Sequence, residues 1–102
     1  MAIRPLDQRI DDYYGGDPLL DEAATLDSTV RSLNNPTGAT QALMQALGAT
    51  ARWRLGGPEP TASVGHQLAD GASVLLIGAP AIEGLRYVAE AGSGVLFVTY
   101  FG

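Results

Sequence analysis

The sequence ends in Gly94-Val95-Leu96-Phe97-Val98-Thr99-Tyr100-Phe101-Gly102, and this stretch decides the fold. β-Branched and aromatic residues dominate it, which predicts a β-strand. Both alternating faces of that strand are apolar, and none of its residues is charged. Such a strand needs cover on both faces, from its own domain or from another chain. Assembly with another polypeptide is therefore the first hypothesis.

The chain is acidic, and its charge is unevenly distributed. The 102 residues carry a net charge of −5, and residues 1–48 hold seven acids against three arginines. An acidic, aromatic-poor front half repels phosphate backbones, and no basic patch is visible. The composition therefore argues against nucleic acid as a partner. The apolar fraction of 46% is ordinary for a folded protein.

Cysteine usage and hydropathy exclude further classes. The chain has no cysteine, which excludes a disulfide scaffold, a thiolate metal site and a cysteine nucleophile. No apolar run approaches membrane-spanning length, and no charged segment followed by an apolar one marks the N-terminus. We therefore expect a protein that is made in the cytoplasm and has no membrane partner.

The front half predicts an arm followed by helices. Residues 1–16 show no clean period and suggest an extended arm or loop. Asp17 suits a helix N-cap, and Pro18 suits the first helical position. A second, shorter helix is predicted from about Thr40 to Leu47. The first helix is predicted from an apolar stripe at spacings of four, three, four and three, which ends at Asn34-Asn35-Pro36 and consists of Leu19, Ala23, Leu26, Val30 and Leu33.

The back half predicts strands and turns. Short apolar runs alternate with breakers that contain glycine or proline. In the first run Trp53 points inward, while Arg52 and Arg54 point outward. The predicted strands are Ala51–Leu55, Ser73–Ile77, Leu85–Ala89 and the closing stretch. This spacing favours a small antiparallel β-sandwich or barrel-like domain. The predicted fold class is α+β, mainly β, with an N-terminal arm and one or two short helices at 1–49 and a β-domain at 50–102.

Two groups of side chains invite a chemical interpretation. His66 could act as a general base that Asp70 orients. The segment is, however, predicted to pass from a strand into a turn, where a spacing of four residues does not bring two side chains together. Asp11, Asp12 and Asp17 could hold a cation, but they lack the spaced ligand series of a calcium loop. We therefore predict surface roles for these groups, and expect neither an enzyme nor a bound cofactor or metal.

The remaining candidates are surfaces. Arg52 and Arg54, with Arg86, form the only concentrated positive feature. They either keep a sheet face soluble or contact an acidic partner surface, such as the front half of a neighbouring copy. The apolar stripe from Leu19 to Leu33 either packs in the core or forms an interface with another chain. The interface candidates are Leu19, Leu26, Val30, Leu33, Arg52, Arg54, Leu96, Val98, Tyr100 and Phe101, with the opposite strand face through Phe97 left open.

Two other classes of function stay open. A small carbohydrate-binding β-module would use Trp53, Tyr87 and Tyr100 as a stacking platform. An adaptor protein would use the predicted helix from Leu19 to Leu33 as a docking face.

A resemblance covers about residues 50–102. It rests on Gly56-Gly57-Pro58-Glu59-Pro60-Thr61-Ala62-Ser63-Val64-Gly65, on Leu68-Ala69-Asp70-Gly71-Ala72-Ser73-Val74, on Gly78 with Ala81-Ile82-Glu83-Gly84-Leu85-Arg86, and on Val95–Phe101. These turn-and-strand patterns resemble small virion structural proteins of tailed bacteriophages. In that class a compact β-domain often follows an N-terminal arm.

The resemblance implies a function carried by surfaces, so no functional residue is carried over. It implies a virion protein that is made in the cytoplasm of a host bacterium. Its partners would be other virion proteins, such as the major capsid or tail protein, and further copies of itself in a homo-oligomer. Capsid decoration or cementing is the preferred role, and a tail or head–tail connector role is the alternative.

Overall fold

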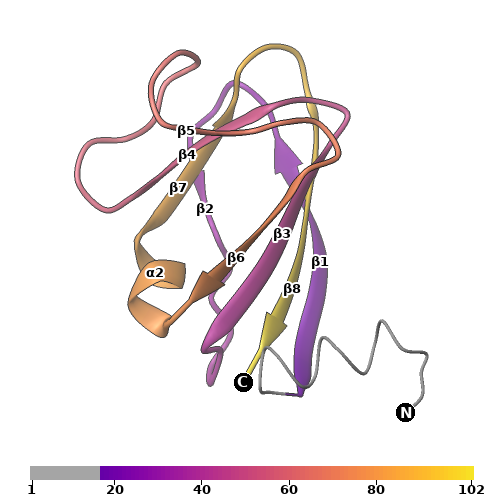
Figure 1. Cartoon of the computed structure of the whole chain (residues 1–102), viewed down its shortest axis with the longest axis vertical. Helices are drawn as coiled ribbons and strands as arrows, with labels where there is room; N and C mark the ends of the chain where they lie inside the picture. The colour runs from indigo at the N-terminus through magenta and orange to yellow at the C-terminus, as the bar shows by residue number, and fades with distance from the viewer. Residues whose placement is uncertain (1–16) are drawn as a thin grey trace.

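Two four-stranded antiparallel sheets face each other in the computed structural model, which describes residues 17–102 (Figure 1). Sheet A has the strand order β1-β8-β3-β6, and sheet B has the order β2-β7-β4-β5. The two sheets share no strand, so the arrangement is not a closed barrel. The elements are β1 (Pro18–Leu26), β2 (Arg31–Ser32), β3 (Gln41–Leu47), β4 (Ala51–Leu55), β5 (His66–Leu68), β6 (Ser73–Ile77), α2 (Ala79–Gly84), β7 (Leu85–Ala89) and β8 (Gly94–Phe101).

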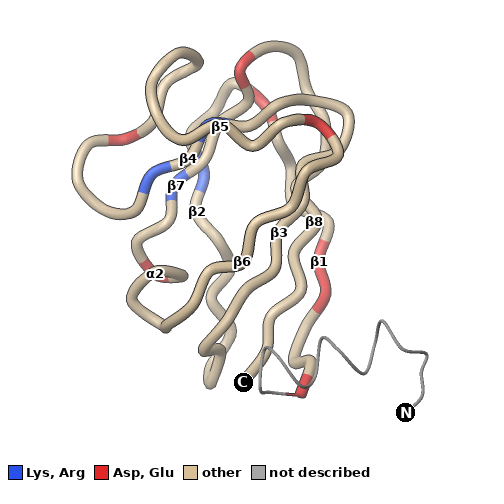
Figure 2. Tube along the Cα trace, in the orientation of Figure 1, with Lys and Arg blue, Asp and Glu red and all other residues tan. Residues whose placement is uncertain are grey.

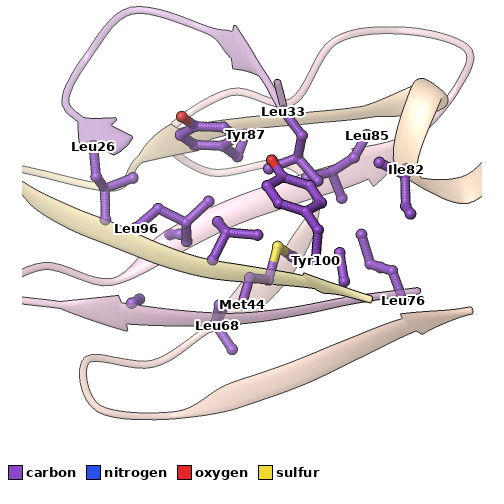
Figure 3. Packing of buried hydrophobic residues seen from close by; sticks show 14 of the residues in the cluster. Leu26, Leu33, Met44, Leu68, Leu76, Ile82, Leu85, Tyr87, Leu96 and Tyr100 are labelled. Carbon is purple, nitrogen blue, oxygen red and sulfur yellow. The ribbon is translucent and has the colours of Figure 1, made fainter. Parts of the chain in front are cut away.

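The core lies between the sheets and follows the period of two that strands impose on side chains. Alternate residues of the central strands point inward, where Figure 3 shows the rings of Tyr87 and Tyr100 among aliphatic side chains. The inward set from sheet A comprises Ala42, Met44 and Ala46 of β3 with Leu96, Val98 and Tyr100 of β8. The inward set from β7 in sheet B comprises Leu85, Tyr87 and Ala89.

The four strands predicted for the back half are confirmed, with the bounds Ala51–Leu55, Ser73–Ile77, Leu85–Ala89 and Gly94–Phe101. The inward direction of Trp53 is confirmed as well, because its ring packs against the core. β8 lies between β1 and β3. The closing stretch is therefore a central strand of its own sheet.

The predicted helix from Asp17 to Leu33 is wrong. Residues 18–26 form β1, which pairs with β8 at Pro18 and continuously from Leu20 to Leu26, and the chain then bends into the short strand β2. The weak helix formers Thr25 and Val30 stand in this segment, and the ladder with β8 supplies hydrogen bonds that a helix would otherwise make internally. Leu26 is fully buried at the end of β1.

The predicted helix from Thr40 to Leu47 is also wrong. The segment forms β3, which pairs with β8 on one side and β6 on the other. Small alanines face inward from β3, and they allow the facing sheet to approach. Strands on either side of the expected boundary at residues 49 and 50 thus hydrogen-bond within one sheet. The arm predicted for residues 1–16 lies outside the described residues.

A close backbone approach at the start of β8 explains one glycine. A Cβ atom at Gly94 would overlap the carbonyl oxygen of Leu47 and crowd the backbone of Gly48 and Ala49. Only glycine lets the turn before β8 pass this close to the end of β3. Within residues 17–102, the structure contains no helix that is long and apolar enough to cross a membrane.

Candidate interaction surfaces

The outward side of sheet A is apolar. Leu43 lies opposite both Thr99 and Leu75 in the sheet register, and Gln45 lies opposite Phe97. Because the neighbours of these residues along each strand face the core, their own side chains point away from it. We call this surface the outer apolar face; its large apolar members are Leu43, Leu47, Leu75, Ile77, Val95 and Phe97.

The outer apolar face is exposed and almost free of charge. Ile77 is 70% exposed and Phe97 is 41% exposed. Among the outward positions of the four strands of sheet A, Asp21 in β1 is the one charged residue. Its carboxylate accepts a hydrogen bond from the Thr99 hydroxyl at 2.7 Å. Figure 2 shows β3, β6 and β8 without coloured charged positions along their length. Interface centres have this composition, since charged residues are depleted there.

Sheet B carries the arginines of the described chain. Arg31 lies in β2, Arg52 and Arg54 lie in β4, and Arg86 lies in β7, so the blue positions gather on this sheet in Figure 2. The outward direction predicted for Arg52 and Arg54 agrees with the register, which places them opposite Val88 and Arg86.

Two of these arginines are paired within the chain. The Nε atom of Arg52 lies 2.6 Å from Oε2 of Glu90, and its NH1 group donates to the carbonyl oxygen of Gly65 at 3.1 Å. Arg31 contacts the carboxylate of Asp27 at 2.9 Å. That hydrogen bond, helped by the backbone N–H of Thr29, holds the pKa of Asp27 below its usual value.

The other two arginines lie directly opposite each other. Arg54 and Arg86 are cross-strand partners. Two like charges that lie directly opposite each other on neighbouring strands repel and destabilise the sheet. Among the described residues, the NH1 group of Arg86 donates to the backbone oxygens of Glu83 and Leu85. Arg54 borders a shallow hollow that is also lined by Leu55, Val64 and His66. This pair is the part of the predicted positive feature that stays available to an acidic surface.

The structure divides the interface candidates into buried and exposed groups. The buried candidates are Leu26, Leu33, Leu96, Val98, Tyr100 and Phe101, and all of them except Phe101 belong to the core cluster between the sheets. Leu19 is 44% exposed at the irregular start of β1, and Val30 is half-buried. Of the two faces of the closing strand, the inner one through Leu96 is core. The outer one through Phe97 remains available.

The sequence analysis did not identify the outer apolar face on β3 and β6, which is formed by Leu43, Leu47, Leu75 and Ile77. In β3 the outward residues Leu43, Gln45 and Leu47 alternate with the inward residues Ala42, Met44 and Ala46. The helical interpretation of this segment concealed that alternation.

The residues considered for catalysis do not form a site. His66 lies in β5 with its ring centroid 4.6 Å from that of Trp53. Asp70 instead accepts a hydrogen bond from the backbone N–H of Gly48 at 2.9 Å, which fixes a turn. The part of the chain that the structure describes contains no group of three His, Cys, Asp or Glu residues that could hold a metal ion. Asp11 and Asp12 lie outside the described residues.

The proposed aromatic platform for a carbohydrate does not exist as predicted. Tyr87 is 1% exposed and Tyr100 is fully buried. Trp53 is half-buried beside His66. The docking helix of the adaptor hypothesis is absent as well, because residues 18–26 form a strand.

Comparison with known proteins found no match: no family model, no curated protein and no solved structure is significantly similar to this chain.

Proposed function

We propose that this protein is a non-enzymatic structural component of a tailed-bacteriophage virion, and that it decorates or cements the capsid. The observation that carries the proposal is the outer apolar face, with Phe97 near its centre. The resemblance of residues 50–102 to small virion proteins points to the same class.

The energetics support a surface function. Transfer of a fully exposed large apolar side chain into an interface contributes about 1.5–3 kcal/mol. Several partly exposed apolar side chains on one flat sheet face can therefore supply a substantial part of a stable contact. A stable interface needs roughly 1,200–2,000 Å² of buried surface. A single sheet face of this small protein supplies part of that area, so we expect contacts through further surfaces.

The Arg54–Arg86 pair provides one such surface. Within residues 17–102 neither arginine forms an ion pair, and two like charges in register are stabilised when a carboxylate lies between them. We expect this pair to contact an acidic surface of a neighbouring virion protein. Contacts of this kind add more to specificity than to affinity.

The first experiment tests whether the protein is part of a particle. Virions of the phage that encodes it are purified through a density gradient, and their proteins are quantified by mass spectrometry. We expect the protein in the particles at a copy number proportional to that of the major capsid protein. A copy number matching tail proteins would place it in the tail instead. Its absence from washed particles would overturn the proposal.

The second experiment tests the surface. Phe97→Glu places a charge in the outer apolar face, and Ala62→Glu places one at an exposed position on the β4–β5 connection, outside the hollow that Arg54 borders. We expect Phe97→Glu to weaken binding to particles that lack the protein by about tenfold or more, equivalent to about 1.4 kcal/mol. Ala62→Glu should bind within about twofold of the unmodified protein. Equal binding by both variants, with equal melting temperatures, would argue against the outer apolar face.

A further inference from the structure

The four sheet edges differ in how they are protected against pairing with another strand. Exposed edges are usually guarded by charges, proline, irregular register or short length. β1 begins with Pro18, has a register shift before Leu20, and carries Asp21 and Glu22. β2 has two residues and β5 has three. β6, with the sequence Ser-Val-Leu-Leu-Ile, contains no charged residue and no proline, pairs in regular register, and is five residues long.

The backbone groups at the β6 edge point outward in a regular pattern. The N–H of Gly78 donates to the oxygen of Thr40 at 2.7 Å, and the N–H of Ala46 donates to the oxygen of Ala72 at 3.2 Å. In an antiparallel ladder the pairs that exchange hydrogen bonds recur at every second residue. The bonds to β3 therefore come from the even-numbered residues of β6. The N–H and C=O groups of Ser73, Leu75 and Ile77 face the free edge.

Nothing in the described part of the chain fills this edge. β6 pairs with β3 alone, and α2 begins only after the strand has ended, as Figure 1 shows. The same odd-numbered residues direct their side chains to the outer apolar face. Ile77 is the most exposed large apolar residue of the described chain. An unpaired backbone and an apolar surface thus coincide on one strand.

We propose that β6 pairs antiparallel with β6 of a second copy, about a twofold axis that passes beside Leu75. This pairing places Leu75 opposite Leu75 of the second copy and Ser73 opposite its Ile77. Two copies of sheet A then form one continuous sheet of eight strands. A twofold contact of this kind is closed and self-complementary.

Charge and continuity favour a second copy as the occupant. β6 carries no charge, so two β6 strands do not repel each other, whereas paired β1 strands would bring Asp21 and Glu22 of both copies together. Leu43 and Leu75 already lie opposite each other across β3 and β6. The proposed pairing extends this row of leucines across the twofold axis into the second copy.

Cysteine cross-linking tests the register, because the chain contains no cysteine of its own. Residues in a hydrogen-bonded antiparallel pair have Cα atoms about 5.5 Å apart, within the range of a disulfide. We expect full-length Leu75→Cys to form a covalent dimer under mild oxidation. Ser73→Cys should not, since the two copies of that residue would lie roughly 13 Å apart at about 3.3 Å per residue. Leu55→Cys, at an exposed position on β4, serves as the matched control for random collisions.

A second variant keeps the test valid if replacement of Leu75 disturbs folding. Ser73→Cys combined with Ile77→Cys retains Leu75 and should cross-link, because these two positions face each other in the proposed dimer. Cross-linking of Leu75→Cys and of the double variant at the level of Leu55→Cys would overturn the proposal. Equal cross-linking of Ser73→Cys alone would overturn the register.

The association itself is measured on the unmodified chain by analytical ultracentrifugation. A five-residue strand contact is small, so we expect a dimer with a dissociation constant of about micromolar. Leu75→Lys sets like charges opposite each other and should weaken the dimer at least tenfold, and Leu55→Lys should not. These measurements use purified protein without particles. A monomeric protein would therefore overturn the dimer but not the virion role, and absence from particles would overturn the virion role but not the dimer.

Discussion

The hydroxyl of Tyr100 donates a hydrogen bond to the carboxylate of Glu22 at 2.5 Å, and its oxygen accepts the backbone N–H of Asn34 at 3.1 Å. Tyr100 itself is fully buried, with its ring in the core in Figure 3. One side chain of β8 therefore fixes both the adjacent strand β1 and the segment that follows β2 in the facing sheet.

We predict that Tyr100→Phe lowers the free energy of unfolding by about 1–3 kcal/mol. The ring packing is retained, but the N–H of Asn34 loses its acceptor and Glu22 loses its donor. Urea denaturation measures the change. Thr99→Val is the control, because it removes a more exposed hydrogen bond to Asp21 on the same strand and should cost less. A Tyr100→Phe protein as stable as the control would contradict the structural role of the hydroxyl.

Alkaline pH should destabilise the protein through its buried tyrosines. Burial raises the pKa of Tyr100 above its usual value of 10.0, and the hydrogen bond to Glu22 raises it further. Burial also raises the pKa of Tyr87. Below pH 10 these hydroxyls are protonated in both the folded and the unfolded chain, so stability is unaffected. Above pH 10 the unfolded chain loses the protons first, and stability falls as the pH rises toward the folded-state values.

The measurement is a series of melting curves between pH 8 and pH 11. Each tyrosine that stays protonated only in the folded state contributes a slope of about 1.4 kcal/mol per pH unit. Tyr100→Phe should therefore show a shallower decline above pH 10 than the unmodified protein, and Tyr87 should contribute to the decline that persists. An identical slope in both proteins would refute this assignment.

Glu90→Gln should destabilise the protein by about 1 kcal/mol. Oε2 of Glu90 accepts hydrogen bonds from Arg52 at 2.6 Å and from Gln67 at 2.7 Å, and both members of the Arg52–Glu90 pair are about one-quarter exposed. The substitution retains size but removes the charge. The difference should shrink in high salt, because screening weakens the original ion pair. Glu59→Gln, at an exposed position, should change stability by no more than about 0.5 kcal/mol.

Gly94→Ala should lower stability by about 1–3 kcal/mol, since the added Cβ would overlap the carbonyl oxygen of Leu47 and the backbone must move. Chemical denaturation of the variant measures the loss, with the neighbouring exposed Ser93→Ala as control. If the two variants are equally stable, the close approach of β8 to the end of β3 is not a constraint on the fold.

The sequence predicted four strands of the back half because the signals there are local, but it did not predict α2 at Ala79–Gly84. The runs at Ser73–Ile77 and Leu85–Ala89 combine β-branched residues with flanking glycines, and these features act within a few residues of chain. The same holds for the closing strand. Arg52 and Arg54 were placed outward correctly because alternation along one strand is also a local property.

The front half could not be predicted in this way. The apolar spacing from Leu19 to Leu33 fits a helix, and the alanines of β3 favour one intrinsically. Which structure forms depends on the partner: β8 offers its backbone to β1 and β3 on its two sides, and the paired residues Glu22 and Val98, like Met44 and Val98, lie far apart in the chain. Pairing over that separation is a tertiary effect, and it overrides the local preference.

The sequence alone determined that this chain ends in an uncharged strand with two apolar faces, and that it has no cysteine chemistry. The tertiary structure decided what those faces do. It buried Leu96, Val98 and Tyr100 between two sheets, and it left Phe97 on a surface shared with β3 and β6. The physical reason is that a two-layer fold this small covers each sheet on one side only. The uncovered side of a central apolar strand therefore becomes the outer apolar face.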